Sequence, residues 1–195
     1  MRRGIDVSEN NGHVDWEAVK AAGVSFAIIR LGYGNRHLDS LFYENVNGAK
    51  DAGLDVGVYY YSYAVNELQA EREAKFLLEI LDDCGLTEED LPMGVWLDME
   101  DADGYKRRHG NPDNEVITDM CFAFILSCNE AGFNCGVYAN LDWLTNRIDT
   151  DAFYDYVPFW CAEWGDACSF DRAVLWQDTD HFMIDGQAFD GDYAL

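Results

Sequence analysis

Short apolar runs alternate with amphipathic stretches along most of this 195-residue chain. Apolar runs of about four to eight residues are typical of buried strands, and apolar residues at a spacing of about 3.6 are typical of helices. The expected strands are Arg3–Ser8, Phe26–Leu31, Val56–Tyr63, Met93–Glu100, Cys135–Tyr138, Phe159–Glu163, Val174–Gln177 and Gln187–Asp190. The expected helices are Trp16–Ala22, Leu41–Ala52, Glu67–Leu81, Glu115–Ala131 and the short Leu141–Asn146. This alternation predicts an α/β fold with a parallel sheet.

The second half of the chain has fewer helices between its strands. After Cys135 only Leu141–Asn146 interrupts the strands, which favours an irregular, TIM-like barrel over a regular one. No linker or low-complexity stretch divides the chain, which contains only 3 prolines. We therefore expect residues 1–195 to form one domain.

The segment Val95–Asp101 is an apolar run that ends in acidic residues. Asp98 and Glu100 are two residues apart, so on a strand their side chains point to the same face. Their backbone positions then lie roughly 6.5–7 Å apart, from a rise of about 3.3 Å per residue. Such a pair suits cleavage of a glycosidic bond, because one acid protonates the leaving oxygen while one anion faces the developing cation. The alternative is a strand that runs out into a solvated acidic turn.

Two more acids lie on the first and last expected strands, at Asp6 and Asp190. These strands are neighbours in a closed barrel, and the ligand site of a parallel barrel lies at the carboxyl ends of its strands. We therefore predict that four acids lie together at this end of the barrel: Asp6, Asp190, Asp98 and Glu100. Converging carboxylates raise one another's pKa, which keeps one of them protonated as a general acid. A single acid at a strand end is more often a turn residue or a helix cap, so the convergence carries the prediction.

Aromatic residues make up 14% of the chain, and several fall along the same expected rim. These residues are Tyr59, Tyr61, Tyr138, Trp160, Trp164 and Trp176. Sugar rings stack on aromatic faces, while tyrosine hydroxyls and tryptophan N–H groups bond to sugar hydroxyls. Tyr59 and Tyr61 share one face of their strand, so at least one should point into the barrel mouth. Core packing is the alternative, above all for Tyr60 and Trp176.

The net charge of −24 excludes polyanionic partners such as nucleic acid and points to neutral polar ligands. No apolar stretch approaches the roughly 20 residues that a membrane span requires, so membrane insertion is not expected. The start of the chain enters a strand directly, without the apolar segment of a signal peptide. The six cysteines form no C-x-x-C pair and no histidine lies at zinc-ligand spacing, so we expect free, mostly buried thiols and no metal or cofactor. The expectation of free thiols is weakest for Cys161 and Cys168, which flank a short loop.

One dense basic cluster, Lys106–His109, follows the acidic pair. A loop after the fourth strand would overhang the cleft. We considered that the cluster pairs with carboxylates of the substrate, although a solvated loop balanced by Asp101 and Asp103 is the simpler interpretation.

Nearly the whole chain resembles the glycoside hydrolase family 25 lysozymes, the Chalaropsis-type N-acetylmuramidases. The resemblance rests on the order and spacing of several short motifs. These are Gly4–Ser8, Val14–Trp16, Phe26–Arg30, Gly32–Gly34, Gly57–Tyr59, Trp96–Glu100, Gly136–Tyr138, Phe159–Ala162, Trp176–Gln177 and Phe189–Asp190.

This resemblance implies a (β/α)5(β)3 barrel that cleaves the β-1,4 bond between N-acetylmuramic acid and N-acetylglucosamine. By position, Glu100 resembles the general acid and Asp98 its partner carboxylate, with Asp6 and Asp190 as supporting acids. Gln177 joins the aromatic residues as an expected substrate contact. The protein would be a monomer that acts on bacterial cell-wall peptidoglycan, either released during phage lysis or excised from a secreted enzyme.

The sequence departs from the family pattern at three places. Tyr59-Tyr60-Tyr61 stands where Tyr-His-Phe is usual, Trp176-Gln177-Asp178 where Trp-Gln-Tyr is usual, and Asp190-Gly191-Asp192 where Asp-x-Asn is usual. The four acids are kept, so the departures bear on the sugar subsites. The competing hypotheses are a chitinase-like barrel hydrolase, a catalytically silent sugar-binding barrel and, more remotely, a calcium-binding protein. Gly94–Trp96 lacks the additional acid usual in chitinases, and no D-x-D-x-D-G loop is present.

Overall fold

A computed structural model describes all residues, 1–195, as nine strands, six α-helices and three short 3-10 helices. The strands are β1 (Arg2–Val7), β2 (Phe26–Tyr33), β3 (His37–Leu38), β4 (Asp55–Tyr61), β5 (Val95–Asp98), β6 (Cys135–Asn140), β7 (Phe159–Ala162), β8 (Ala173–Ile184) and β9 (Gln187–Ala194). The α-helices are α1 (Trp16–Ala21), α2 (Phe42–Asp51), α3 (Glu67–Asp83), α4 (Tyr105–Arg108), α5 (Asn114–Glu130) and α6 (Leu141–Asn146). The 3-10 helices are η1 (Glu9–Asn11), η2 (Glu88–Asp90) and η3 (Thr150–Ala152). No helix is both long enough and apolar enough to cross a membrane.

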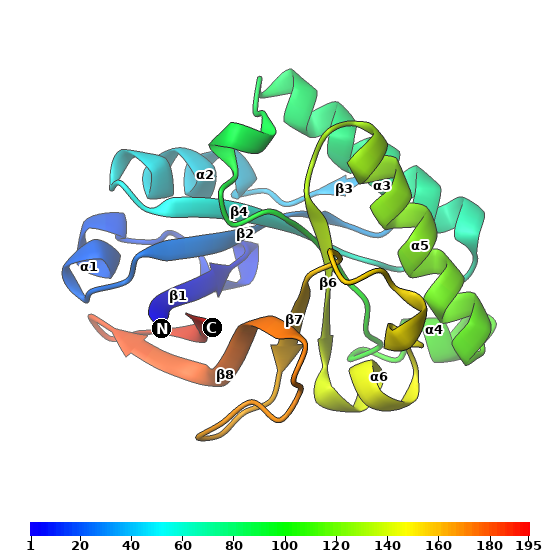
Figure 1. Ribbon diagram of the computed structural model, residues 1–195. Helices are drawn as coiled ribbons and strands as arrows, with labels where there is room; N and C mark the ends of the chain where they lie inside the picture. The colour runs from blue at the N-terminus through cyan, green and yellow to red at the C-terminus, as the bar shows by residue number, and fades with distance from the viewer.

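Eight of the strands close into a barrel (Figure 1). The order is β1-β9-β8-β7-β6-β5-β4-β2, and β1 pairs with β2 to complete the ring, while β3 adds to the edge of β2. The prediction of an irregular α/β barrel is therefore confirmed.

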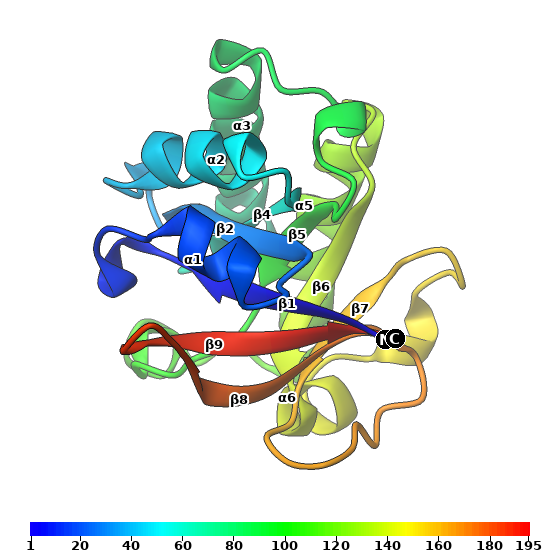
Figure 2. The ribbon, with the colours of Figure 1, turned by 90° about the vertical axis from the view of Figure 1, so that its left-hand side faces the viewer.

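The expected parallel sheet is found except at the short edge strand β3 and at β9, which runs antiparallel to both of its neighbours. The cause is the turn Asp185–Gly186, whose φ angles of 46° and 85° are both positive. Two residues with positive φ make a tight hairpin, and such a turn can join only antiparallel strands. β8 and β9 form this hairpin, which extends beyond the barrel (Figure 2).

The helices cover the first part of the barrel wall and leave β8 and β9 without a helical layer (Figures 1 and 2). Side-chain caps define several helix starts: Asp15, Asn66, Asp113 and Asn140 each accept a hydrogen bond from a backbone N–H of the first turn. The outward-facing strand residues and the inner helix faces form the main core of 42 buried residues.

The barrel interior is closed below the mouth by a smaller apolar cluster. It consists of Phe26, Ile28, Tyr59, Trp96, Trp160 and Leu175. Large rings fit there because two facing positions are glycines. A Cβ on Gly4 would lie 2.1 Å from the Phe26 ring, and one on Gly136 would lie 2.6 Å from the Trp96 ring. The interior below the mouth is thus a packed, largely apolar floor.

The sequence pattern located the main helices to within about two residues but misplaced several strand ends. The strand expected over Met93–Glu100 is β5, which ends at Asp98, so Glu100 lies beyond it. The strand expected over Val56–Tyr63 is β4, which ends at Tyr61. β8 and β9 run on to Ile184 and Ala194, past their expected ends. The two-residue β3 and the four-residue α4 were not predicted, because elements so short carry no periodicity.

All six cysteines are free thiols, as expected from the sequence, and four of them are buried. The loop after β7 brings the Cys161 and Cys168 thiols together with the Glu163 carboxylate. Their sulfur and carboxylate oxygen atoms lie within 4.8 Å of one another. The Glu163 carboxylate already accepts hydrogen bonds from the backbone N–H and the hydroxyl of Ser169, at 2.6 and 2.8 Å. The Glu163 carboxylate is therefore engaged in holding the backbone of this loop at Ser169.

Candidate active site

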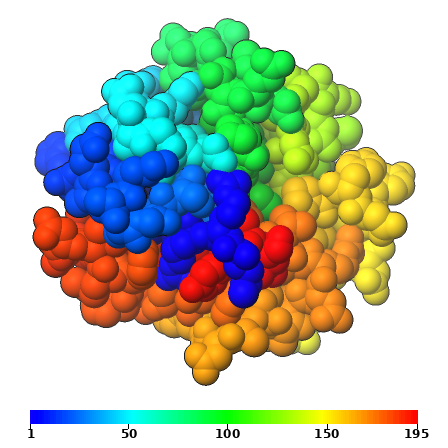
Figure 3. Space-filling view, turned by 60° about the vertical axis from the view of Figure 1, so that its left-hand side comes forward, coloured from blue at the N-terminus to red at the C-terminus, as the bar shows by residue number.

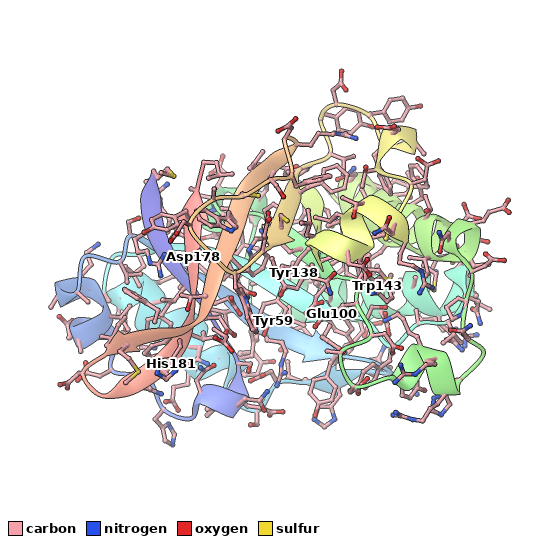
Figure 4. All side chains as sticks on the ribbon, turned by 90° about the horizontal axis from the view of Figure 1, so that it is seen from below. Tyr59, Glu100, Tyr138, Trp143, Asp178 and His181 are labelled. Atoms are coloured by element: carbon pink, nitrogen blue, oxygen red, sulfur yellow. The ribbon has the colours of Figure 1, made fainter.

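A cavity of about 270 Å³ opens at the mouth of the barrel, above the apolar floor. Its lining consists of Asp6, Ser8, Asn10, Asn11, Arg30, Tyr59, Tyr61, Asp98, Glu100, Tyr138, Trp160, Gln177 and Asp190. Figure 4 shows Tyr59, Glu100 and Tyr138 close together, between the β8–β9 hairpin on one side and helices α4 and α6 on the other. All four predicted acids and most of the predicted sugar contacts therefore share one hollow.

The alternation of strand side chains explains which residues reach this cavity. On β2, β4 and β5 the inward positions pass from floor to mouth as Ile28 to Arg30, Tyr59 to Tyr61 and Trp96 to Asp98. The parallel register sets Asp98 beside Tyr61 on one strand and beside Tyr138 on the other. The same geometry turns the intervening residues outward into the main core.

Asp98 and Glu100 both line the cavity although β5 ends between them. The backbone stays tied to its neighbours across this point, because Ser62 N donates to Asp98 O and Met99 N donates to Tyr138 O. Asp98 is the deeper residue, with 5% of its surface exposed, and its Oδ1 atom is buried without a hydrogen-bond partner. Burial, then the nearby Glu100 carboxylate, raises the pKa of Asp98 well above its usual range. Burial also raises the pKa of Glu100, which lies nearer to solvent.

Asp6 and Asp190 meet from the opposite wall, as direct partners in the β1–β9 register. Asp190 lies in the middle of an antiparallel strand, so the prediction that it ends a parallel strand is wrong, although its position at the mouth is as expected. Gln177 Nε2 donates to Asp6 Oδ2 at 2.8 Å. Burial and the Asp190 carboxylate raise the pKa of Asp6 well above its usual range, and burial raises the pKa of Asp190 to about 6.

A fifth acid, Asp192, lies fully buried beneath this pair and was not predicted as a site residue. Trp160 Nε1 donates to Asp192 Oδ1 at 2.9 Å, while the other carboxylate oxygen has no partner. Burial, followed by the charge of Asp6, raises the pKa of Asp192 well above its usual range. Asp192 is two residues from Asp190 and therefore on the same face of β9, so its position in the site could have been predicted from the sequence.

Aromatic rings form the floor and sides of the cavity. Trp160 packs against Tyr138 and Tyr59, with ring centroids 4.5 and 6.3 Å apart. Gln177 joins this group, because its Oε1 accepts from the Tyr138 hydroxyl at 3.1 Å and from Trp164 Nε1 at 3.3 Å. A flat apolar face beside fixed polar groups suits a pyranose ring with its hydroxyls.

Two of the predicted aromatic contacts lie elsewhere. Trp164 does not line the cavity; it is 62% exposed at the rim, where it reaches Gln177. Trp176 faces away from the barrel interior, because Leu175 and Gln177 on either side of it point inward. Trp176 stacks on Tyr193, and its Nε1 donates to Glu163 O. It is therefore a packing residue, the alternative given for it above, and not a sugar contact.

Arg30, Ser8, Asn10 and Asn11 line the cavity without having been predicted. Arg30 is held by Asp39 and Glu9, at 2.8 and 3.2 Å, so much of its charge is already paired. Arg30 could have been predicted, because it lies two residues after Ile28 on β2 and therefore points to the same inward face. The other three come from the turn after β1, where no periodic pattern exists.

The basic cluster does not overhang the cleft as a unit. Lys106 turns inward and is buried, donating to the carbonyls of Ser62 and Glu100, so it cannot reach a substrate carboxylate. Arg107 and Arg108 remain exposed. The hypothesis fails for the lysine because α4 begins at Tyr105 and points that one side chain at the protein.

A closed barrel with clustered acids and aromatic rings at its mouth has the architecture of a glycoside hydrolase. The chain belongs to glycosyl hydrolases family 25, whose family model matches residues 5–187. The match includes Asp6, Asp98 and Glu100 and stops three residues before Asp190.

Similar proteins agree with this assignment. The autolytic lysozyme of Clostridium acetobutylicum is 39% identical over 74 residues, which are 38% of this chain and 22% of that protein. The solved family 25 glycosyl hydrolase of Bacillus anthracis superposes with a TM-score of 0.82 at 18% identity, over 100% of this chain and 88% of that one. The muramidase of Trichobolus zukalii gives 0.80 at 18% identity, over 100% and 94%. These two structures show that the fold is shared.

Proposed function

We propose that this protein is a lysozyme that hydrolyses the β-1,4 bond between N-acetylmuramic acid and N-acetylglucosamine in bacterial peptidoglycan. The observation that carries the proposal is the meeting of Asp98, Glu100, Asp6 and Asp190 in one aromatic-lined cavity. Membership of family 25 and the similarity to an autolytic lysozyme support the choice of polymer. We expect it to act as a monomer at the cell wall, without a metal or cofactor.

Glu100 is assigned as the general acid. It lies nearer to solvent than Asp98, and burial raises its pKa, which favours the protonated form that a general acid needs to protonate the leaving glycosidic oxygen. Once ionised, the same carboxylate activates the attacking water. Both steps need a group that reaches the cleft and titrates near the working pH.

Asp98 is assigned as the carboxylate that faces the developing positive charge on the sugar. It acts either by attacking the anomeric carbon or by steadying the substrate's acetamido oxygen as the nucleophile, and both routes retain the anomeric configuration. Asp6 and Asp190 support this pair from the opposite wall, where Gln177 fixes Asp6.

The sugar chain is assigned to the surface formed by Tyr59, Tyr61, Tyr138, Trp160 and Gln177, with Trp164 at the rim. Neutral hydrogen-bonding groups and ring faces dominate this surface. In a chain of charge −24, such contacts suit an uncharged glycan better than a polyanion.

The decisive experiment is mass analysis of muropeptides after digestion of purified cell walls and reduction with borohydride. Cleavage by a muramidase leaves reduced N-acetylmuramic acid at the new ends, whereas reduced N-acetylglucosamine would identify a glucosaminidase and contradict the proposal. Digestion of chitin in parallel tests the chitinase alternative. Wall binding without any new reducing ends, at the level of the Glu100→Gln variant, would identify a silent sugar-binding barrel.

A further inference from the structure

Lys106 is a buried cation that lies directly behind the acidic pair. Only 2% of its surface is exposed, although lysine is rarely buried unless it is paired. It comes from α4, the short helix that follows the Asp98–Glu100 segment. A buried ammonium is unfavourable unless hydrogen bonds and opposite charges surround it, so its placement here calls for a specific environment.

The hydrogen bonds of Lys106 join the ends of two neighbouring strands. Its Nζ donates to the carbonyl of Ser62, just past β4, and to the carbonyl of Glu100 at 2.9 Å, just past β5. Glu100 is outside the strand ladder that holds Asp98. Lys106 therefore fixes the backbone of the proposed general acid at the point where the sheet no longer does so.

The titratable groups around Lys106 come from several elements. They are Glu73 on α3, Asp98 on β5, Glu100, Asp101 and Asp103 in the following loop, and the uncharged Cys121 thiol on α5. The Tyr61 ring of β4 lies 5.9 Å from the ammonium. Glu73 is itself held by the Ser62 hydroxyl and the Tyr63 N–H, at 2.7 and 2.9 Å.

Asp98 needs this cation if it is to work as an anion. The charged groups that act on it are the Glu100 and Asp6 carboxylates, which oppose its ionisation, and Lys106 and Arg30, which favour it. The Tyr59, Tyr61 and Tyr138 hydroxyls also interact with it, and burial raises the pKa of each. Arg30 is committed to Asp39 and Glu9. Lys106 has the stronger influence of the two cations on Asp98, and it also favours ionisation of Glu100.

We propose that Lys106 is a positioning residue, which fixes the backbone of Glu100 and supplies the buried positive charge that lets Asp98 act as an anion. The inference rests on the proposed function for its catalytic part, whereas the electrostatic link between Lys106 and Asp98 stands apart from any substrate.

The test compares Lys106→Gln, which removes the charge, with Lys106→Arg, which keeps it. Lys75→Gln is the matched control, because Lys75 is an α3 lysine with a side chain 66% exposed. For Lys106→Gln we expect the pH profile of wall hydrolysis to move upward by about 1 pH unit, because an opposite charge nearby lowers a carboxyl pKa. We expect kcat at the wild-type optimum to fall by up to about tenfold, as less Asp98 is ionised there, with KM within about twofold. Lys106→Arg should keep the wild-type profile.

A purely structural role predicts a different pattern. Activity and melting temperature would then fall together, and the profile would keep its position on the pH axis, which would overturn the inference. If Lys106→Gln alone does not fold, the double variant Lys106→Gln/Glu73→Gln is measured, since it also removes the buried Glu73 carboxylate that would otherwise lose its cation. The upward shift is expected in the double variant too.

A titration that needs no substrate separates this inference from the proposed function. Carboxyl ¹³C NMR, assigned with Asp98→Asn, reports the ionisation of Asp98 in the wild type and in Lys106→Gln. A higher pKa of Asp98 in Lys106→Gln supports the link even if the wild type cleaves no peptidoglycan, in which case the proposed function fails alone. An unchanged pKa of Asp98 in a folded, wall-cleaving variant overturns the inference.

Discussion

The two walls of the cavity carry the same functional group in different surroundings. On the β5 side, Asp98 and Glu100 have the buried ammonium of Lys106 behind them. On the β1–β9 side, which carries Asp6, Asp190 and Asp192, the neutral donor Gln177 bonds to Asp6 and the neutral donor Trp160 bonds to Asp192. Burial raises the pKa of acids on both walls. Lys106 opposes that rise for both Asp98 and Glu100 on the β5 wall, whereas on the other wall Arg3 opposes it at Asp192, as the weakest of the influences on that group.

This difference suggests a division of labour. A carboxyl group that must change its charge during a reaction benefits from a nearby cation, which brings its pKa back toward the working range. A carboxyl group whose pKa is raised by burial and by neighbouring carboxylates is favoured in its protonated form, in which it can act as a hydrogen-bonding scaffold. The following predictions test this contrast.

The largest effect is expected on the β5 wall, from Glu100→Gln. Removing a general acid lowers turnover by about 10²–10⁴-fold. The amide has the same shape, so the circular dichroism spectrum and melting temperature should stay as in the wild type. Release of reducing ends from cell walls measures the loss, and near-normal turnover would contradict the role given to Glu100.

A smaller loss is expected on the opposite wall, from Asp190→Asn. Asp190 supports Asp6 without contacting the scissile bond in our assignment, so we expect kcat/KM to fall by about tenfold, less than for an acid–base residue. The profile of kcat/KM against pH should also lose a titration near pH 6, where burial places the pKa of Asp190. If Asp190→Asn were as inactive as Glu100→Gln, the two walls would not differ in role.

Asp192→Asn is expected to stabilise the protein. Burial, then the charge of Asp6, raises the pKa of Asp192, so the folded chain holds a proton that the unfolded chain releases above pH about 4. Folding stability is therefore lost as the pH rises from that point, and the asparagine variant escapes this loss. We expect the variant to melt about 2–4 °C above the wild type at pH 7, equivalent to about 1 kcal/mol in a chain of this size. The gap should close toward pH 4; a constant gap would mean that titration of Asp192 is not its cause.

The smallest effect is expected at the rim, from Trp164→Ala. Loss of one exposed stacking ring should raise KM by about two- to tenfold and leave kcat unchanged, from about 0.5–1.5 kcal/mol per aromatic contact. Tyr154→Ala is the control, because the Tyr154 side chain is similarly exposed but makes no hydrogen bond to a residue of the cavity lining, as Trp164 does to Gln177. An equal change in both variants would remove Trp164 from the substrate path.

The sequence could predict the barrel and the meeting of its acids because both follow from strict rules. Alternation of side chains placed Asp98 and Glu100 on one face, and closure of the ring placed Asp6 beside Asp190. The same alternation could have excluded Trp176, because Gln177 points inward. The direction of β9 could have been predicted from Asp185-Gly186, a dipeptide typical of tight hairpins.

Other parts of the site follow from packing that a linear pattern does not contain. Lys106 lies in a run of basic residues, which is typical of a solvated surface, yet the four-residue helix α4 turns this one lysine inward. Ser8, Asn10 and Asn11 reach the cavity from an irregular turn. No periodicity marks such residues, since their positions depend on contacts with distant segments.

The pairing of β1 with β9 has a consequence for engineering. Arg2 lies opposite Ala194, so the two ends of the chain are adjacent (Figures 2 and 3). They meet at the end of the barrel away from the hairpin that flanks the cavity (Figure 2). A short peptide could join them into a circular backbone, and new ends could be cut into a surface loop elsewhere. A reporter module fused at either terminus would likewise emerge on the side away from the cavity, leaving the approach to the barrel mouth unobstructed.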